Sequence, residues 1–147
     1  MSSTTQVLTL SAALFSLFVV GCGDDQPPLG EVSGVVTLDG KPLPKARIVF
    51  QPLDRKSPPS SGTTDDQGRY VLHYNRNHDG AWIGKHQVRI TSGRRTESGD
   101  GGKPIKVKER VPAKYNVNSE LEREVTRGRQ EIDFQLEGKG KIIESEG

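Results

Sequence analysis

The 147-residue sequence contains one cysteine, one tryptophan and few aromatic residues, with Phe, Trp and Tyr making up 5% of the chain. A single cysteine excludes an intrachain disulfide and any zinc site built from cysteines. The chain also lacks a large excess of one charge, because it contains 21 Lys and Arg and 19 Asp and Glu, which gives a formal net charge of +2. Nucleic acid is therefore not an expected partner, since domains that bind it are strongly and locally basic. The length suits one domain.

Charge is missing altogether from the N-terminus, where no Asp, Glu, Lys or Arg precedes Asp24. The apolar run over residues 7–20 is shorter than the ~20 residues that span a membrane, and it has the length of a signal-peptide core. Residues 19–22 read VVGC, which resembles the lipobox of bacterial lipoproteins. The resemblance implies that residues 1–21 are a cleaved signal peptide and that Cys22 carries diacylglycerol and an acyl chain such as palmitate.

Two alternatives stay open for this segment, a plain cleaved signal and an uncleaved anchor, because residues 2–6 contain no Lys or Arg. The lipoprotein interpretation is favoured because the only cysteine stands where the apolar run gives way to polar sequence. It predicts a protein held by its lipid in a bacterial cell envelope, on the periplasmic or outer face, with no cofactor besides that lipid. Residues 22–30 then form the lipidated N-terminus and a polar tether.

The rest of the chain has the pattern of short strands separated by turns. Apolar and polar residues alternate with a period of two, which is typical of half-buried strands. The clearest alternation covers residues 32–38, 46–50, 69–74 and 85–92. Asp39-Gly40 is a tight-turn dipeptide, and the turn over residues 65–68 is expected to use an Asp side chain as acceptor for backbone N–H groups.

No long amphipathic helix is evident, and about seven short strands are expected. The predicted fold class is all-β, a single antiparallel seven-stranded sandwich over residues 31–136, followed by a flexible tail at residues 137–147. Residues 119–126 fit either a short helix with a capping box or a strand, and the strand is favoured. Residues 93–103 contain no aliphatic or aromatic side chain and are expected to form a mobile loop.

Three stretches give the chain a family resemblance: residues 35–50 (VVTLDGKPLPKARIVF), 62–72 (GTTDDQGRYVL) and 84–90 (GKHQVRI). Their succession resembles the carboxypeptidase regulatory-like domain, a transthyretin-like (prealbumin-like) sandwich. It is most similar to the variant found in small lipoproteins of planctomycete-type bacteria, in which a motif like residues 111–116 (VPAKYN) precedes two final strands. The resemblance implies the transthyretin-like strand arrangement and a non-catalytic β-module, without implying a particular ligand.

Residues that carry chemistry are sparse and scattered. His73, His78 and His86 are the only histidines, and the strand period places His73 and His86 on opposite faces, so no metal site is expected. No calcium-loop pattern surrounds Asp65 and Asp66. No serine stands in a recognisable nucleophile turn, and the terminal motif of transthyretin-like hydrolases is absent. We therefore predict no catalytic residue and no enzyme activity, and a transthyretin-like hydrolase is the least favoured alternative.

Two surface features suggest binding. Trp82 and Tyr115 are candidates for an aromatic platform on which a sugar could stack. A cluster of basic residues, partly balanced by acidic residues nearby, is a candidate for binding anionic lipid or polysaccharide: Arg94, Arg95, Lys103, Lys106, Lys108 and Arg110. The sequence therefore predicts a structural or protein-interaction module of the cell envelope, with a carbohydrate-binding module as the alternative, so an envelope protein or a polysaccharide is the expected partner.

Overall fold

The computed structural model describes residues 27–96 and 103–144, and its regular elements there are β-strands except for one turn of 3-10 helix, η1 (Ala113–Tyr115). The predicted all-β class is therefore confirmed. The predicted signal peptide at residues 1–21 and the predicted lipid attachment site, Cys22, lie outside the described residues. Within the part of the chain that the structure describes, no helix is long and apolar enough to cross a membrane.

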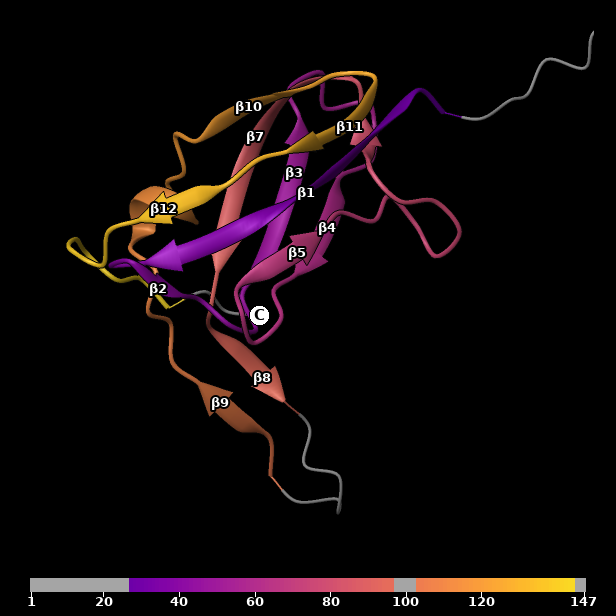
Figure 1. The fold of residues 1–147 in the computed structure, drawn as a ribbon. Helices are drawn as coiled ribbons and strands as arrows, with labels where there is room; N and C mark the ends of the chain where they lie inside the picture. Colours follow the sequence, from indigo (N-terminus) through magenta and orange to yellow (C-terminus); the bar gives the residue numbers. More distant parts are fainter. Residues whose placement is uncertain (1–26, 97–102, 145–147) are drawn as a thin grey trace, which may run out of the picture.

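A six-stranded sheet is organised around β1 (Leu29–Leu38), the long indigo strand in Figure 1. One side of β1 pairs antiparallel with three short strands in turn: β6 (Ala81–Trp82), β5 (Arg69–Val71) and β2 (Lys41–Pro42). Its other side pairs parallel with two strands: β11 (Gly128–Glu131) and β12 (Phe134–Leu136). This parallel pairing was not expected from the sequence, and the strands are more numerous and shorter than the seven predicted.

The second sheet has four strands and is antiparallel throughout, in the order β10 (Glu122–Val125), β7 (Gly84–Thr91), β3 (Arg47–Pro52) and β4 (Ser60–Thr63). The strand favoured for residues 119–126 is thus confirmed as β10. The chain between β10 and β11 passes from this sheet to the first, so that β11 and β12 arrive running in the same direction as β1.

The hydrophobic core lies between the two sheets, as the strand period predicts. Ile48 and Phe50 of β3 and Val88 of β7 are buried on one side, and Val32 and Val36 of β1 are buried on the other. The rings of Phe50 and Phe134 meet edge to face across the layers, with centroids 6.2 Å apart. These contacts join the two sheets into one sandwich.

Of the segment expected to be a mobile loop, residues 93–103, residues 97–102 lie outside the described residues and Arg94–Thr96 forms strand β8. Strand β8 pairs antiparallel with β9 (Ile105–Val107), just beyond that segment, in a hairpin that extends away from both sheets (Figure 1). The two strands pair through their backbones, which requires no apolar side chains in the sequence. Residues 137–144 contain no strand, but hydrogen bonds tie this tail to the body, among them the following two. Gly138 N donates to Asp39 Oδ1 over 2.9 Å, and Ala113 N donates to Lys141 O over 2.8 Å.

Candidate functional site

The outer face of the four-stranded sheet presents amide and guanidinium side chains on its two central strands. In β3 and β7 successive side chains point to opposite faces, so the residues that follow the buried Phe50 and Val88 in the chain lie on the outer face. Gln51 lies opposite Gln87 in the register, and Arg89 comes two residues after Gln87 on the same face. The sheet therefore provides a fixed floor for these three polar side chains.

The turn that follows β3 adds a second guanidinium to this face. Asp54 organises the turn, because its carboxylate accepts hydrogen bonds from Lys56 N over 3.0 Å and from Ser57 N over 3.2 Å. These backbone hydrogen bonds, that of Ser57 first, lower the pKa of Asp54. Leu53 N donates to Lys85 O over 2.9 Å, which ties the turn to β7.

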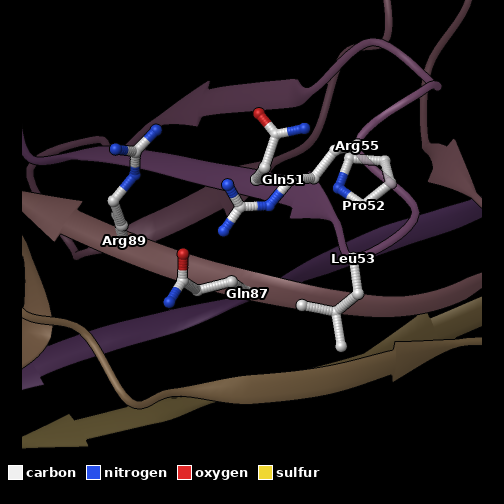
Figure 2. A pocket seen from close by; sticks show the side chains of 6 residues that line it. All are labelled: Gln51, Pro52, Leu53, Arg55, Gln87 and Arg89. Carbon is white, nitrogen blue, oxygen red and sulfur yellow. The ribbon is translucent and has the colours of Figure 1, made fainter.

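Arg55 occupies the left-handed position of this turn, with φ of +54°. A side chain other than Gly costs about 1–2 kcal/mol in this conformation. Arg55 N donates to Pro52 O over 3.1 Å, so the turn holds the residue in place. Figure 2 shows the Arg55 side chain reaching back over β3, with its guanidinium group toward Gln51 and Gln87.

Together these residues enclose an open hollow of about 400 Å³, lined by Gln51, Pro52, Leu53, Arg55, Gln87 and Arg89 (Figure 2). The Nε2 group of Gln87 donates to Ser119 O over 2.9 Å, which fixes that amide and leaves its oxygen as an acceptor. Among the described residues, the side chains of Gln51, Arg55 and Arg89 have no hydrogen-bond or ion-pair partner. The hollow thus offers donors and acceptors that the protein does not use itself.

A second hollow of about 330 Å³ shares Pro52 and Leu53 with the first and continues to Trp82, Ile83 and His86. Leu53 lines both hollows and Ile83 lines the second, and both are exposed, so they form an apolar ridge along the second hollow. Trp82 packs edge-on against Tyr74, with ring centroids 6.1 Å apart. Trp82 therefore borders the candidate site, as a half-buried side chain held by its neighbour.

His86 lies beneath this ridge and is 1% exposed. Burial lowers its pKa, and Asp54 opposes that shift. Its Nε2 atom is 2.9 Å from Trp82 O, and because a carbonyl oxygen only accepts, Nε2 carries the hydrogen. The Nδ1 atom is buried and has no partner among the described residues. His86 is thus a neutral core residue that supports the strand carrying Gln87.

The structure does not bring Trp82 and Tyr115 together. Trp82 pairs with Leu29 at the start of β1, whereas the Tyr115 hydroxyl accepts a hydrogen bond from Glu137 N, just after the strand that pairs with Leu38. The two residues therefore lie near opposite ends of β1, a strand of ten residues that spans about 30 Å at ~3.3 Å per residue. They form no common platform, and only Trp82 lies near the hollows.

The three histidines contact different partners. His73 Nδ1 is 2.6 Å from Asp79 Oδ1, and His78 Nδ1 is 3.0 Å from Asn75 Oδ1. In the described residues, no group of three or more His, Cys, Asp or Glu side chains is placed to hold a metal ion. The basic cluster lies on the β8–β9 hairpin and the segment after it, where Lys106 pairs with Glu144 over 3.5 Å.

Sequence reasoning did not identify Gln51, Arg55, Gln87 and Arg89 as candidates. The alternation of the strands predicts that Gln51, Gln87 and Arg89 face outward, but it predicts the same for every other solvent-facing residue of a strand. The pairing of β3 with β7 and the turn of Arg55 bring them together, and both depend on the fold.

Comparisons with known proteins add remote likenesses of fold. No protein-family model matches the sequence, and no curated protein matches it either. A 9R-lipoxygenase from Cyanothece PCC8801 aligns over 92% of this chain, with 16% identity and a TM-score of 0.41, and the chain spans 18% of that enzyme. A Pseudomonas aeruginosa protein, provisionally described as carbohydrate binding, aligns over 75% of this chain and 90% of its own, with 13% identity and a TM-score of 0.42. Neither likeness carries an argument about function.

Proposed function

We propose that this chain is a non-catalytic lipoprotein of the cell envelope whose transthyretin-like, carboxypeptidase regulatory-like sandwich binds a carbohydrate. The observation that carries the proposal is the hollow on the outer face of the four-stranded sheet, where the side chains of Gln51, Arg55 and Arg89 have no partner among the described residues. The lipid anchor and the family assignment are supported by the sequence, at residues 19–22 and over residues 31–136.

The chemistry of the hollow suits a sugar. An amide both donates and accepts, so Gln51 and the free oxygen of Gln87 match the hydroxyl groups that line a sugar ring. Pro52 and Leu53 offer an apolar edge for the ring's C–H face. The volume of about 400 Å³ falls within the ~300–1,000 Å³ of small-ligand sites.

The side chains around the hollow support a binding role rather than a catalytic one. Its lining contains no hydroxyl, thiol, imidazole or carboxylate group that could act as nucleophile or general base. Ser57, at the neighbouring hollow, donates its hydroxyl to Asp54 over 3.0 Å. The imidazole of His86 is buried and bound to a backbone carbonyl.

A protein-interaction module that adds a partner's strand is less well supported. The edge strands of the four-stranded sheet are β10 and β4. Three of the four residues of β10 are charged, which discourages edge-to-edge pairing. At the β4 edge, Ser61 already exchanges backbone hydrogen bonds with His73.

The test is a glycan array probed with the full chain in detergent micelles. We expect the wild-type protein to bind a restricted set of glycans and Gln51→Ala to lose at least ~tenfold in affinity, since it removes a side chain that lines the hollow. Ser61→Ala is the matched control, because Ser61 lies on the neighbouring strand outside the lining. A folded wild-type protein that binds no glycan would refute the carbohydrate function.

A further inference from the structure

We infer that the hollow on β3 and β7 selects an acidic glycan, one whose sugar residues carry carboxylate or sulfate groups. The inference rests on the proposed carbohydrate-binding function and names the chemical class of its ligand. It concerns the hollow lined by Gln51, Pro52, Leu53, Arg55, Gln87 and Arg89 (Figure 2).

The lining of the hollow carries positive charge. Two of its six lining side chains are arginines, and none of the six is Asp or Glu. In the described part of the chain, neither Arg55 nor Arg89 forms an ion pair. The nearest acids do not line the hollow: Glu122 lies opposite Gln87 on the edge strand β10, and the carboxylate of Asp54 is used by the turn and lines the neighbouring hollow. An anion would therefore complete a site that the protein leaves positive.

Arg55 adopts a backbone conformation that is unfavourable for its residue type. Its backbone is left-handed, a conformation for which Gly or Asn is the usual choice. The turn is nevertheless fully organised, by the Asp54 carboxylate and by the hydrogen bond from Leu53 N to Lys85 O. Unfavourable backbone conformations of this kind gather at ligand clamps, where the side chain is what is needed. Here that side chain delivers a guanidinium group to the hollow.

The amide and apolar side chains beside the two arginines suit an acidic sugar better than a small inorganic anion. A guanidinium group binds carboxylate or sulfate oxygens through two parallel N–H donors. The amide groups of Gln51 and Gln87 stand beside the arginines and can take up hydroxyl groups next to that charge. Leu53, which is 44% exposed, offers apolar contact at the edge. Charged groups, hydroxyls and C–H surface occur together on a uronic acid or a sulfated sugar.

The experiment is isothermal titration of the full chain in detergent micelles with tetragalacturonate, its methyl ester, a sulfated dextran oligosaccharide and hexaglutamate. The methyl ester keeps the sugar and removes the charge, whereas hexaglutamate keeps the charge and removes the sugar. We expect tetragalacturonate or the sulfated oligosaccharide to bind at least ~tenfold more tightly than the other two probes. The stronger of the two acidic arms identifies the anionic group as carboxylate or sulfate.

Three variants locate the binding. Arg55→Gln and Arg89→Gln are each expected to weaken binding of the acidic probe by ~tenfold, and neither should affect folding because both side chains are exposed. Arg69→Gln removes the same charge from an exposed position on β5 in the opposite sheet, and it should leave the affinity unchanged.

The measurements test the acidic specificity separately from carbohydrate binding itself. Equal binding of the methyl ester, lost in Gln51→Ala, would overturn the acidic specificity and leave a neutral carbohydrate site. Equal binding of hexaglutamate, or an equal loss in Arg69→Gln, would also overturn it, because the protein would then respond to charge alone. Binding of none of the four probes would overturn it too, and the glycan array would then decide the wider function.

Discussion

At the scale of single residues, Glu109 is the most buried acidic residue in the part of the chain that the structure describes. It is 4% exposed, and its Oε1 atom accepts hydrogen bonds from the Ser92 hydroxyl over 2.6 Å and from Ser92 N and Val111 N over 2.9 Å each. Gly93 N donates to the other carboxylate oxygen over 3.2 Å. The carboxylate thus joins the end of β7 to the segment that follows the β8–β9 hairpin.

These contacts set the pKa of Glu109. Burial alone would raise it, but the hydrogen bonds from the Ser92 hydroxyl, Val111 N, Ser92 N and Gly93 N lower it below the ordinary value of 4.5. A group whose pKa is lower in the folded state stabilises the fold above its unfolded pKa. That contribution declines as the pH falls below about 4.5 and is lost once the pH passes through the lowered folded value.

We predict that Glu109→Gln lowers the free energy of unfolding by about 1.5–3 kcal/mol at pH 7, because the amide keeps one acceptor oxygen and turns an N–H group toward other donors. Urea unfolding at pH 7, 5 and 3 should show the gap between wild type and variant closing as the pH falls. Glu137→Gln, at an exposed carboxylate, should leave stability unchanged. A gap that stays constant with pH would contradict the ionic role.

At the scale of elements, β1 depends on a close approach at Gly34. Here the chain between β11 and β12 bends over the strand, with Ile132 N donating to Ser33 O and Asp133 Oδ1 accepting from Val35 N, both over 2.8 Å. The carbonyl oxygen of Ile132 accepts the Tyr70 hydroxyl over 2.6 Å. A Cβ atom at Gly34 would collide with that same carbonyl group.

Gly34→Ala should therefore lower the free energy of unfolding by about 1–3 kcal/mol, because the clash is with backbone and cannot be relieved by turning a side chain. Gly40→Ala serves as the comparison. Its φ is +75° and no atom lies within 4 Å of the added Cβ, so only the left-handed backbone conformation disfavours alanine, and we expect a loss of about 1 kcal/mol there. Chemical denaturation measures both variants. A smaller loss for Gly34→Ala than for Gly40→Ala would contradict the close packing of β1 against Ile132.

The same strand shows what the sequence could and could not predict. The burial of Val32, Val36 and Phe50 follows from the alternation of apolar residues, because each strand must turn one face to the core. The parallel partners of β1 leave no such local signal, since pairing depends on where the chain returns after β10. The candidate hollow was missed for the same reason. Glutamine and arginine are ordinary surface residues until the pairing of β3 with β7 gathers them.

At the scale of the whole molecule, the register places the two ends of the sandwich. Trp82 pairs with Leu29 at the start of β1, and His86, four residues later, pairs with Pro52. Thr91 pairs with Arg47 at the other end of β3, and the β8–β9 hairpin leaves from there (Figure 1). The hairpin and the start of β1 therefore lie at opposite ends, and the candidate hollow lies toward the start of β1.

This arrangement gives the proposed anchor a geometric consequence. Residues 23–28 separate Cys22 from β1, and a chain of that length extends at most about 20 Å. A lipid on Cys22 would therefore hold the start of β1, and the hollow near it, close to the membrane. The basic β8–β9 hairpin, at the opposite end, would point away from that membrane, so a phospholipid headgroup of the same bilayer is a poor partner for it.

The anchor itself is tested by the intact mass of protein extracted from bacterial membranes. We predict that residues 1–21 are absent and that Cys22 carries diacylglycerol and an acyl chain, because the sequence VVGC at residues 19–22 resembles a lipobox. Acyl chains contribute about 0.8 kcal/mol per buried methylene, so the lipidated chain should stay with the membrane through a high-salt wash. Cys22→Ala should keep its leader and lack lipid, whereas Gly23→Ala, just beyond the motif, should be processed normally. An unmodified Met1 or Cys22 in the wild-type mass would contradict the lipoprotein prediction.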